Sequence, residues 1–312
     1  MKQCCHFLLS LMAVGCAISA CNVLGEPDAV KKVTFSISPF TLVGDDVPLT
    51  KTSIVVDGGD NLFVWAARDT CGVYPDTGSQ IWFSMESGVG AKTAQFDGGG
   101  WALKPSSTYY SYYPFIGNIY LNRNHIPVSF TGQKQPGTSS IEHIGKYDYM
   151  CTAGSMTDEA GHLNFQYNHL CCIIRPNVTL PAGTWTKLAI TAPTAVFAKK
   201  GYYNLMADQP VIIPTETSNQ IQIDLEGITL TQETNFRVYV LSAPVNLKGV
   251  QITVSVMNDQ RAEYQCKKTP SVEYPASFIG GLTCNSWEAV PQSMGLILED
   301  WGDGGSISGQ AE

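Results

Sequence analysis

The ten cysteines are the residues of this 312-residue chain with the most obvious chemical potential. Four of them lie within the first 21 residues, and the other six are spread through the rest of the chain: Cys71, Cys151, Cys171, Cys172, Cys266 and Cys284. None of the six has a partner at the Cys-x-x-Cys spacing that is typical of zinc sites and thioredoxin-like redox sites. A bridge between the neighbours Cys171 and Cys172 would be strained, because adjacent strand residues point to opposite faces. We therefore expect no metal site and mostly buried free thiols that act as small apolar side chains, although three disulfides in any of fifteen pairings stay open.

The histidines of the chain body are too scattered for their spacing to indicate a metal site: His125, His143, His162 and His169. In segment 163–169 every second residue is apolar up to Tyr167, and His169 is the next residue in this series. In a strand, His169 would therefore lie on the same face as Leu163, Phe165 and Tyr167. A buried polar group is normally hydrogen-bonded. We therefore expect His169 to be a core histidine with hydrogen-bond partners rather than a metal ligand or a general base.

Motifs of the common enzyme classes are absent from the sequence. There is no Gly-x-Ser-x-Gly elbow, no His-Glu-x-x-His pair, no glycine-rich phosphate loop and no calcium loop of EF-hand spacing. We expect neither an enzyme nor a bound cofactor. A glycoside hydrolase stays open as an alternative, because it needs only two carboxylates about 5 to 9.5 Å apart, a geometry that a sequence does not display.

The densest aromatic feature is segment 108–115, which contains four tyrosines. In a strand, Tyr109 and Tyr113 would face one way, and Tyr110 and Tyr112 the other. We expect the segment to pack in a β-sandwich core, where tyrosine is common. The alternative is that Tyr110 and Tyr112 form a platform on which sugar rings stack, which would make the chain a glycan-binding protein.

The first 21 residues form a targeting segment. An almost wholly apolar stretch, residues 7–20, would reach about 21 Å as a helix, short of the roughly 30 Å hydrocarbon core of a membrane. It ends in Ile18-Ser19-Ala20-Cys21, an aliphatic residue and two small residues before a cysteine, as in bacterial lipoprotein signals. We predict a lipoprotein signal peptide over residues 1–20 and lipidation of Cys21, which then anchors the mature chain to a membrane. A weaker match ending at Cys16 and an ordinary secretory signal are the alternatives.

The composition indicates a folded, globular protein that does not bind nucleic acid. Hydrophobic residues make up 44% of the chain and charged residues 15%, which excludes a disordered tail or a coiled coil. The formal net charge is −8, from 19 Lys and Arg against 27 Asp and Glu, and the positive residues are scattered. Nucleic-acid binding would require those residues to be gathered on one face.

Apolar and polar residues alternate with the period of two that is typical of half-buried β-strands. The alternation is clearest in four segments: residues 33–38, 163–167, 221–225 and 250–256. No stretch shows a sustained helical period with caps. The sequence therefore predicts an all-β fold of two sandwiches, with residues 52–158 and strand 33–40 in the first and residues 159–312 in the second. The polar stretch 157–161 marks the predicted boundary.

Four short motifs follow one another between residues 63 and 170: Asp69-Thr70-Cys71-Gly72-Val73-Tyr74-Pro75, Trp101 with Tyr112-Tyr113-Pro114, Asp148-Tyr149-Met150, and Phe165-Gln166-Tyr167-Asn168-His169. Their order and spacing resemble those of the fimbrillin-like (Mfa-like) lipoproteins of anaerobic Gram-negative bacteria, the subunits of type V pili. In that family the first motif is Asp-x-Ile-Gly-Val-Phe-Pro, so Cys71 replaces an isoleucine. The resemblance extends from the signal peptide to about residue 180, and beyond it only β-rich character and length agree.

The resemblance implies a lipoprotein that is carried to the outer membrane, exposed on the cell surface and built from two transthyretin-like β-sandwiches. Members of the family serve in adhesion as stalk, tip or anchor subunits of a fimbrium. In stalk subunits a surface protease removes an N-terminal segment with its first strand. The groove that this leaves then binds a strand of the next subunit.

Applied to this chain, the resemblance makes residues 21–51 a removable segment. Its strand carries three apolar residues on the face expected to be buried, Val33, Phe35 and Ile37, and residues 40–51 are predicted to form a loop. Lys51 stands where the family has a processing arginine and is the predicted site of proteolytic cleavage, with an uncut subunit as the alternative. Segment 294–298 is the candidate donor strand, unless it is the last strand of the core. The expected partners are other pilus subunits and a surface receptor.

Overall fold

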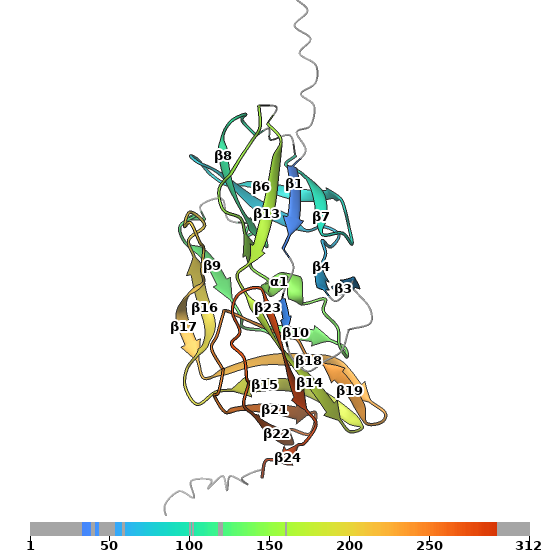
Figure 1. Cartoon of the computed structure of the whole chain (residues 1–312). Helices are drawn as coiled ribbons and strands as arrows, with labels where there is room; N and C mark the ends of the chain where they lie inside the picture. Colours follow the sequence, from blue (N-terminus) through green and yellow to red (C-terminus); the bar gives the residue numbers. More distant parts are fainter. Residues whose placement is uncertain are drawn as a thin grey trace, which may run out of the picture. The chain divides into compact units, whose positions relative to one another are not determined.

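The computed structural model describes residues 33–38, 41–43, 54–57, 60–99, 101, 103–117, 121–159 and 161–291. The predictions for Cys21, Lys51 and segment 294–298 concern residues outside these ranges. Strands make up almost all the regular structure described, with a single α-helix, α1 (Ile144–Tyr147), so the predicted all-β class is confirmed (Figure 1). A helix with the length and hydropathy needed to cross a bilayer does not occur in these ranges.

The first sheet contains eight strands: β1 (Val33–Ile37), β5 (Thr70–Pro75), β6 (Ile81–Ser87), β7 (Thr93–Asp97), β8 (Thr108–Tyr113), β11 (Met150–Cys151), β12 (Ser155–Met156) and β13 (Leu163–His169). They are hydrogen-bonded in the order β11-β13-β1-β7-β6-β5-β8-β12, and β11 pairs with β8 as well. The path of paired strands therefore returns to its start, and we call this the closed sheet. Figure 1 shows β1 beside β13 and β7 within it.

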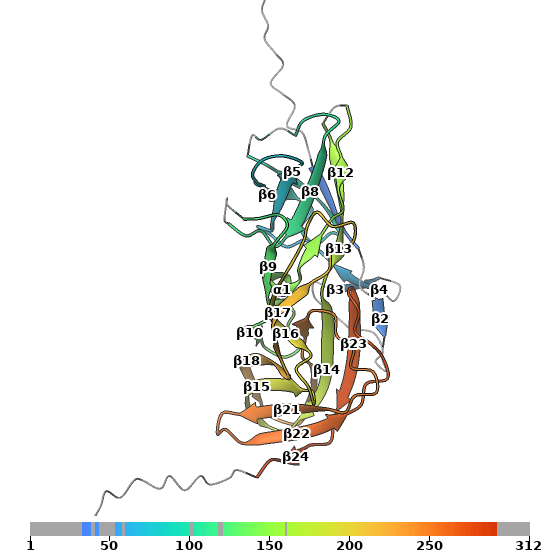
Figure 2. The same cartoon turned by 90° about the vertical axis from the view of Figure 1, so that its left-hand side faces the viewer.

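Two further large sheets are built mainly from later residues. The six-stranded sheet has the order β10-β18-β15-β21-β22-β24 and is formed by β10 (Gln133–Pro136), β15 (Gly183–Thr191), β18 (Gln220–Leu230), β21 (Ile252–Asn258), β22 (Glu263–Lys268) and β24 (Glu288–Ala289). The five-stranded sheet has the order β19-β14-β23-β2, with β20 also paired to β14, and is formed by β2 (Thr41–Val43), β14 (Cys172–Leu180), β19 (Thr234–Arg237), β20 (Val240–Ser242) and β23 (Phe278–Cys284). Figure 2 shows β2 beside β23.

The remaining strands form two small sheets. One has the order β17-β16-β9, from β9 (Ile126–Ser129), β16 (Phe197–Tyr203) and β17 (Ile213–Ser218), and the other pairs β3 (Ile54–Asp57) with β4 (Asp60–Phe63). All four segments that the alternation singled out contain strands of the structure, namely β1, β13, β18 and β21.

The predicted boundary between residues 158 and 159 does not coincide with the sheets. β13 follows this boundary, yet it pairs with β1 in the closed sheet. β9 and β10 precede the boundary, yet they pair with β16 and β18. Each of the two predicted domains therefore shares strands with the other, because strand pairing here joins segments that are far apart in the sequence.

Buried apolar side chains gather in two clusters. One belongs to the closed sheet and includes Phe35, Phe83 and Phe96, and a larger one is built mostly from the other sheets. The six body cysteines are all buried and free, which confirms the expectation for most of them. Burial raises the pKa of the Cys151 thiol to about 12, so this thiol stays protonated at neutral pH.

Candidate functional site

β1 is the first described strand of the chain, yet it lies in the interior of the closed sheet. It runs parallel to β13, with Phe35 opposite Phe165. It runs antiparallel to β7, with Phe35 opposite Ala94. Removal of β1 would therefore leave two neighbouring strands with unpaired backbone N–H and C=O groups, which is a ready template for a new strand.

The side chains of β1 alternate between the core and the surface. Val33 and Phe35 are fully buried and Ile37 nearly so, while Thr34 and Ser36 are half-buried. Burial of one such apolar side chain stabilises the fold by about 1.5–3 kcal/mol. The prediction that Val33, Phe35 and Ile37 share the buried face is confirmed.

Phe35 fills a cage of aromatic rings. Its ring centroid lies 4.4 Å from that of Phe96, 5.1 Å from that of Phe165 and 5.5 Å from that of Tyr167. The Trp65 ring stands edge-on at 6.3 Å, and its Nε1–H donates a hydrogen bond of 3.2 Å to the backbone carbonyl of Phe35. These rings come from β7, β13 and the segment that precedes β5, so together they form a preshaped hole for one large apolar side chain.

Two buried side chains that are hydrogen-bonded to each other, those of His169 and Asp148, hold the residue that follows β1. His169 Nε2 lies 2.9 Å from the backbone oxygen of Ser38, and His169 Nδ1 lies 2.8 Å from Asp148 Oδ1. The side chains of His169 and Asp148 are 0% and 2% exposed, so a buried, hydrogen-bonded pair of side chains holds the end of β1. The expectation of a hydrogen-bonded core histidine is confirmed.

We expect Asp148→Asn to lower the free energy of unfolding by about 1–2 kcal/mol, because it weakens the hydrogen bond between two buried side chains, those of His169 and residue 148. Chemical denaturation measures this change, and hydrogen exchange at the amide of Ser38 should become faster. Glu226→Gln is the matched control, since it removes an exposed ion pair with Lys134 (2.6 Å) and should leave both readouts unchanged. Equal effects of the two variants would contradict the role of the buried pair.

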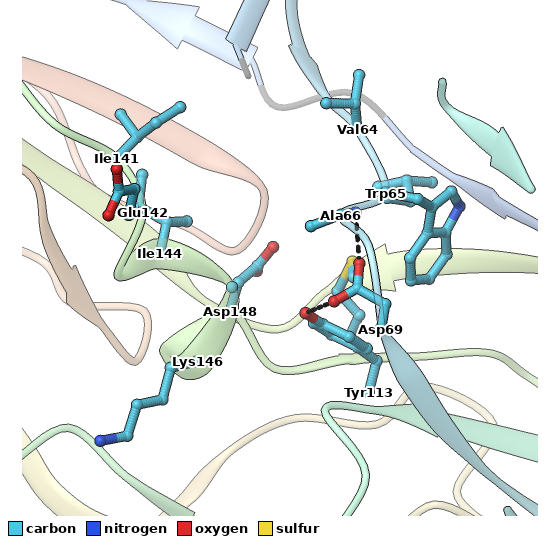
Figure 3. Close-up of a pocket in the computed structure, with 13 residues that line it drawn as sticks. Val64, Trp65, Ala66, Asp69, Tyr113, Ile141, Glu142, Ile144, Lys146 and Asp148 are labelled. Atoms are coloured by element: carbon cyan, nitrogen blue, oxygen red, sulfur yellow. Dashed lines mark hydrogen bonds between the residues drawn. The ribbon is translucent and has the colours of Figure 1, made fainter. Parts of the chain in front are cut away.

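A pocket of about 380 Å³ lies at the same end of β1, and Ile37, Trp65 and Asp148 are among the residues that line it. Asp69, a half-buried carboxylate that also lines this pocket, accepts hydrogen bonds from the Ala66 N–H (2.7 Å) and the Tyr113 hydroxyl (2.9 Å), as Figure 3 shows. Burial raises the pKa of Asp69, and these two hydrogen bonds act against the rise.

Asp69 and Asp148 are thus each engaged in hydrogen bonds that hold the fold together. This arrangement gives no support to the glycoside hydrolase alternative. Among the residues that the structure describes, no group of three or more His, Cys, Asp or Glu side chains is placed to hold a metal ion.

The proposed tyrosine platform is wrong for Tyr112. Its side chain is fully buried, its hydroxyl donates a 2.6 Å hydrogen bond to Gln80 Oε1, and its ring stacks on that of Tyr74 at 6.1 Å. Tyr110 is half-buried. Tyr110 and Tyr112 lie on one face of β8 as predicted, but that face is covered by the larger core cluster and offers no pair of rings to a sugar.

The segment 21–51 contains a second strand that the sequence did not indicate. β2 lies within residues 40–51, which were predicted to form a loop, and that prediction is wrong for residues 41–43. β2 runs parallel to β23 at the edge of the five-stranded sheet, with Thr41 opposite Phe278. Residues 33–43 therefore contribute one strand to each of two sheets.

No protein-family model matches the chain, and no curated protein matches it. Among solved structures, one from Bacteroides ovatus described as a cell adhesion protein has a TM-score of 0.54 at 12% identity, over 84% of this chain and 97% of its own. Another, from Bacteroides uniformis and described in the same way, has a TM-score of 0.51 at 14% identity, over 72% of this chain and 91% of its own. The chain shares its fold with these two Bacteroides proteins, in agreement with the resemblance to fimbrillin-like lipoproteins.

Proposed function

We propose that this chain is a surface-exposed pilus subunit of the fimbrillin-like lipoproteins, which acts in adhesion and assembles by strand exchange. The observation that carries the proposal is the place of β1, which is the first described strand of the chain and yet pairs on both sides within the closed sheet. A strand near a chain end can leave without unthreading the rest of the fold. What it leaves is a groove between β13 and β7.

The groove would select its new strand by backbone pairing and by side-chain shape. Strand addition to a sheet edge takes its affinity from main-chain hydrogen bonds and its specificity from alternate side chains. Here the alternate positions are those of Val33, Phe35 and Ile37, and the middle one requires a large apolar side chain. A donor strand therefore needs three apolar residues at intervals of two. Leu296 and Leu298 in segment 294–298 have this spacing, with Met294 two residues before them.

Cleavage after Lys51 would release both strands of the segment together. β2 ends at Val43 and β3 begins at Ile54, so Lys51 lies between them in the sequence. A cut at this point separates β1 and β2 from every later strand. The donor would then restore a strand beside β13 and β7, and a second one beside β23.

Lipidation of Cys21 would hold the uncut precursor on the outer membrane. Because the predicted anchor precedes β1, cleavage at Lys51 would also release the subunit from its lipid. The same cut would thus open the groove and free the subunit for a fimbrium. We propose in addition that the two core clusters correspond to the two transthyretin-like sandwiches of the family.

We expect Cys21→Ser to move the protein from the membrane fraction to the soluble fraction, because the acyl chains on Cys21 are the predicted membrane anchor. Cell fractionation measures the shift, and mass spectrometry of the mature N-terminus identifies the acylated residue. Cys16→Ser is the matched control and should leave the protein in the membrane fraction. A mature chain that starts at another residue, or carries an unmodified Cys21, would rule out this anchor.

A further inference from the structure

A second hollow of the surface lies on the three-stranded sheet, apart from the residues of β1. Its volume is about 490 Å³, and its lining comes from all three strands of this sheet and from α1. Figures 1 and 2 both show α1 beside β9. Sites for small ligands usually have volumes of about 300–1,000 Å³, so this hollow is large enough for one or two sugar units.

The charge of this hollow is opposite to that of the whole chain. Its lining includes three basic side chains, those of His125, Lys146 and Lys200, and we call it the basic hollow. Among the described residues that line it there is no Asp or Glu, although the chain has a net charge of −8. The pocket at the end of β1, by contrast, is lined by carboxylates such as Asp69 and Asp148. The basic hollow therefore favours an anionic ligand.

Both lysines of the basic hollow have neighbours that hold them and still leave positive charge for a ligand. Lys200 Nζ lies 3.4 Å from Glu216 Oε2, and the other oxygen of this carboxylate is paired with Lys199. One carboxylate thus serves two ammonium groups, which leaves one positive charge in excess. Lys146 Nζ lies 5.2 Å from the centroid of the Tyr147 ring, a contact that leaves the charge of Lys146 uncompensated.

A flat ring surface lies beside these charges. The His125 ring stacks on that of Tyr202, with centroids 3.7 Å apart and an interplanar angle of 17°. Tyr202 pairs with Pro127, and Lys200 pairs with Ser129, between β16 and β9. Side chains directly opposite each other share a face of a sheet, as do those two residues apart. The ring stack, Pro127 and Lys200 therefore lie on one face, where a pyranose with its C–H face on the rings would present a carboxylate to the ammonium group.

We propose that the basic hollow binds a carboxylate-bearing sugar, a sialic acid or a uronic acid, at the end of a surface glycan. The inference rests on the adhesive role in the proposed function and names the chemistry of the receptor. Hydrogen bonds from ammonium groups to the carboxylate would supply charge-assisted contacts, and the stacked rings would pack against the apolar face of the sugar. The stacked rings favour a sugar over an acidic peptide, whose extended chain has no such face.

The test is isothermal titration of the purified full chain with four probes: sialyllactose, trigalacturonic acid, neutral lactose and a hexaglutamate peptide. We expect at least one of the two acidic sugars to bind about tenfold more tightly than lactose and hexaglutamate, and the sugar that does so identifies the source of the carboxylate. Added salt should weaken this binding, because it screens exposed charges. Failure of both acidic sugars to bind, or equal affinity for lactose or hexaglutamate, would overturn the proposal.

Variants place the binding in the basic hollow. Lys200→Gln should weaken it about tenfold and Tyr202→Ala about threefold to tenfold, while Lys248→Gln, a change of an exposed lysine between β20 and β21, is the matched control and should leave it unchanged. Wild-type affinity in Lys200→Gln would contradict the assignment.

The outcome is independent of pilus assembly, because the titration uses uncut monomers. A chain that assembles after trypsin treatment but binds neither acidic sugar would lose this ligand and keep the pilus role. A chain that binds the sugar but does not assemble would keep the ligand and lose the stalk role.

Discussion

Phe35→Ala should lower the free energy of unfolding by about 3–5 kcal/mol. The ring that it removes is fully buried in a cage formed by Trp65, Phe96, Phe165 and Tyr167. These rings come from separate segments and cannot all move inward, so the cavity would stay largely open. The loss therefore includes the cost of the cavity as well as that of the buried surface. Chemical denaturation followed by tryptophan fluorescence measures the change, since Trp65 is one wall of the cage.

Ser36→Ala is the matched control on the same strand. Its hydroxyl lies 2.9 Å from Thr93 Oγ1 on the half-exposed face of β1, so its removal should change the free energy of unfolding by less than about 0.5 kcal/mol. If Phe35→Ala cost no more than Ser36→Ala, β1 would not be seated in the closed sheet in solution. The basis for a groove with the shape of β1 would then be lost.

Limited trypsin treatment should cut after Lys51 and convert monomers into heat-resistant oligomers. The physical reason is that loss of β1 exposes the edges of β13 and β7 together with the hole left by Phe35. A strand from another copy that fills both would bury this surface again and restore the ladder. Denaturing gels of unheated samples would show a ladder, and N-terminal sequencing should identify Thr52 as the new first residue.

Lys51→Gln should prevent both the cut and the ladder. Lys32→Gln is the control, because a cut at that point precedes β1 and leaves it attached to the fold, so this variant should still assemble. If trypsin cuts after Lys51 and the product stays monomeric at high concentration, the stalk role fails. A tip or anchor subunit would then be the better description of the chain.

The local alternation of apolar and polar residues predicted where strands occur, but it could not predict which strands pair with one another. β1 and β13 each carry apolar residues at every second position. The burial of these residues, and that of His169, could therefore be predicted from the alternation of side chains along a strand. Neither segment indicates that the two strands pair in parallel, although the polar stretch 157–161 separates them in the sequence. The domain boundary placed in that stretch therefore cut through the closed sheet.

The two errors at the site have equally local causes. β2 has three residues, too few to show a period of two, and it exists because β23 offers a free edge. The sequence correctly placed Tyr112 on the same face of the strand as Tyr110, but alternation does not indicate which face of a sheet is covered by other residues. Here the face that carries Tyr112 belongs to the larger core cluster, which also includes Ile126 and Tyr203 of the three-stranded sheet.

A disulfide lock on β1 tests the central claim, that this strand must leave for assembly to occur. Ser36 and Thr93 lie directly opposite each other on β1 and β7, with their hydroxyl oxygens 2.9 Å apart, so Ser36→Cys/Thr93→Cys should form a bridge under mild oxidation. The control is Thr184→Cys/Thr229→Cys, an exposed pair on β15 and β18 with hydroxyl oxygens 3.2 Å apart. Both variants are cut with trypsin and their oligomers are counted with and without reductant. We predict that the β1 lock stays monomeric until it is reduced and then assembles, while the control assembles in both conditions. Assembly of the oxidised β1 lock to the same extent as the control would contradict strand exchange.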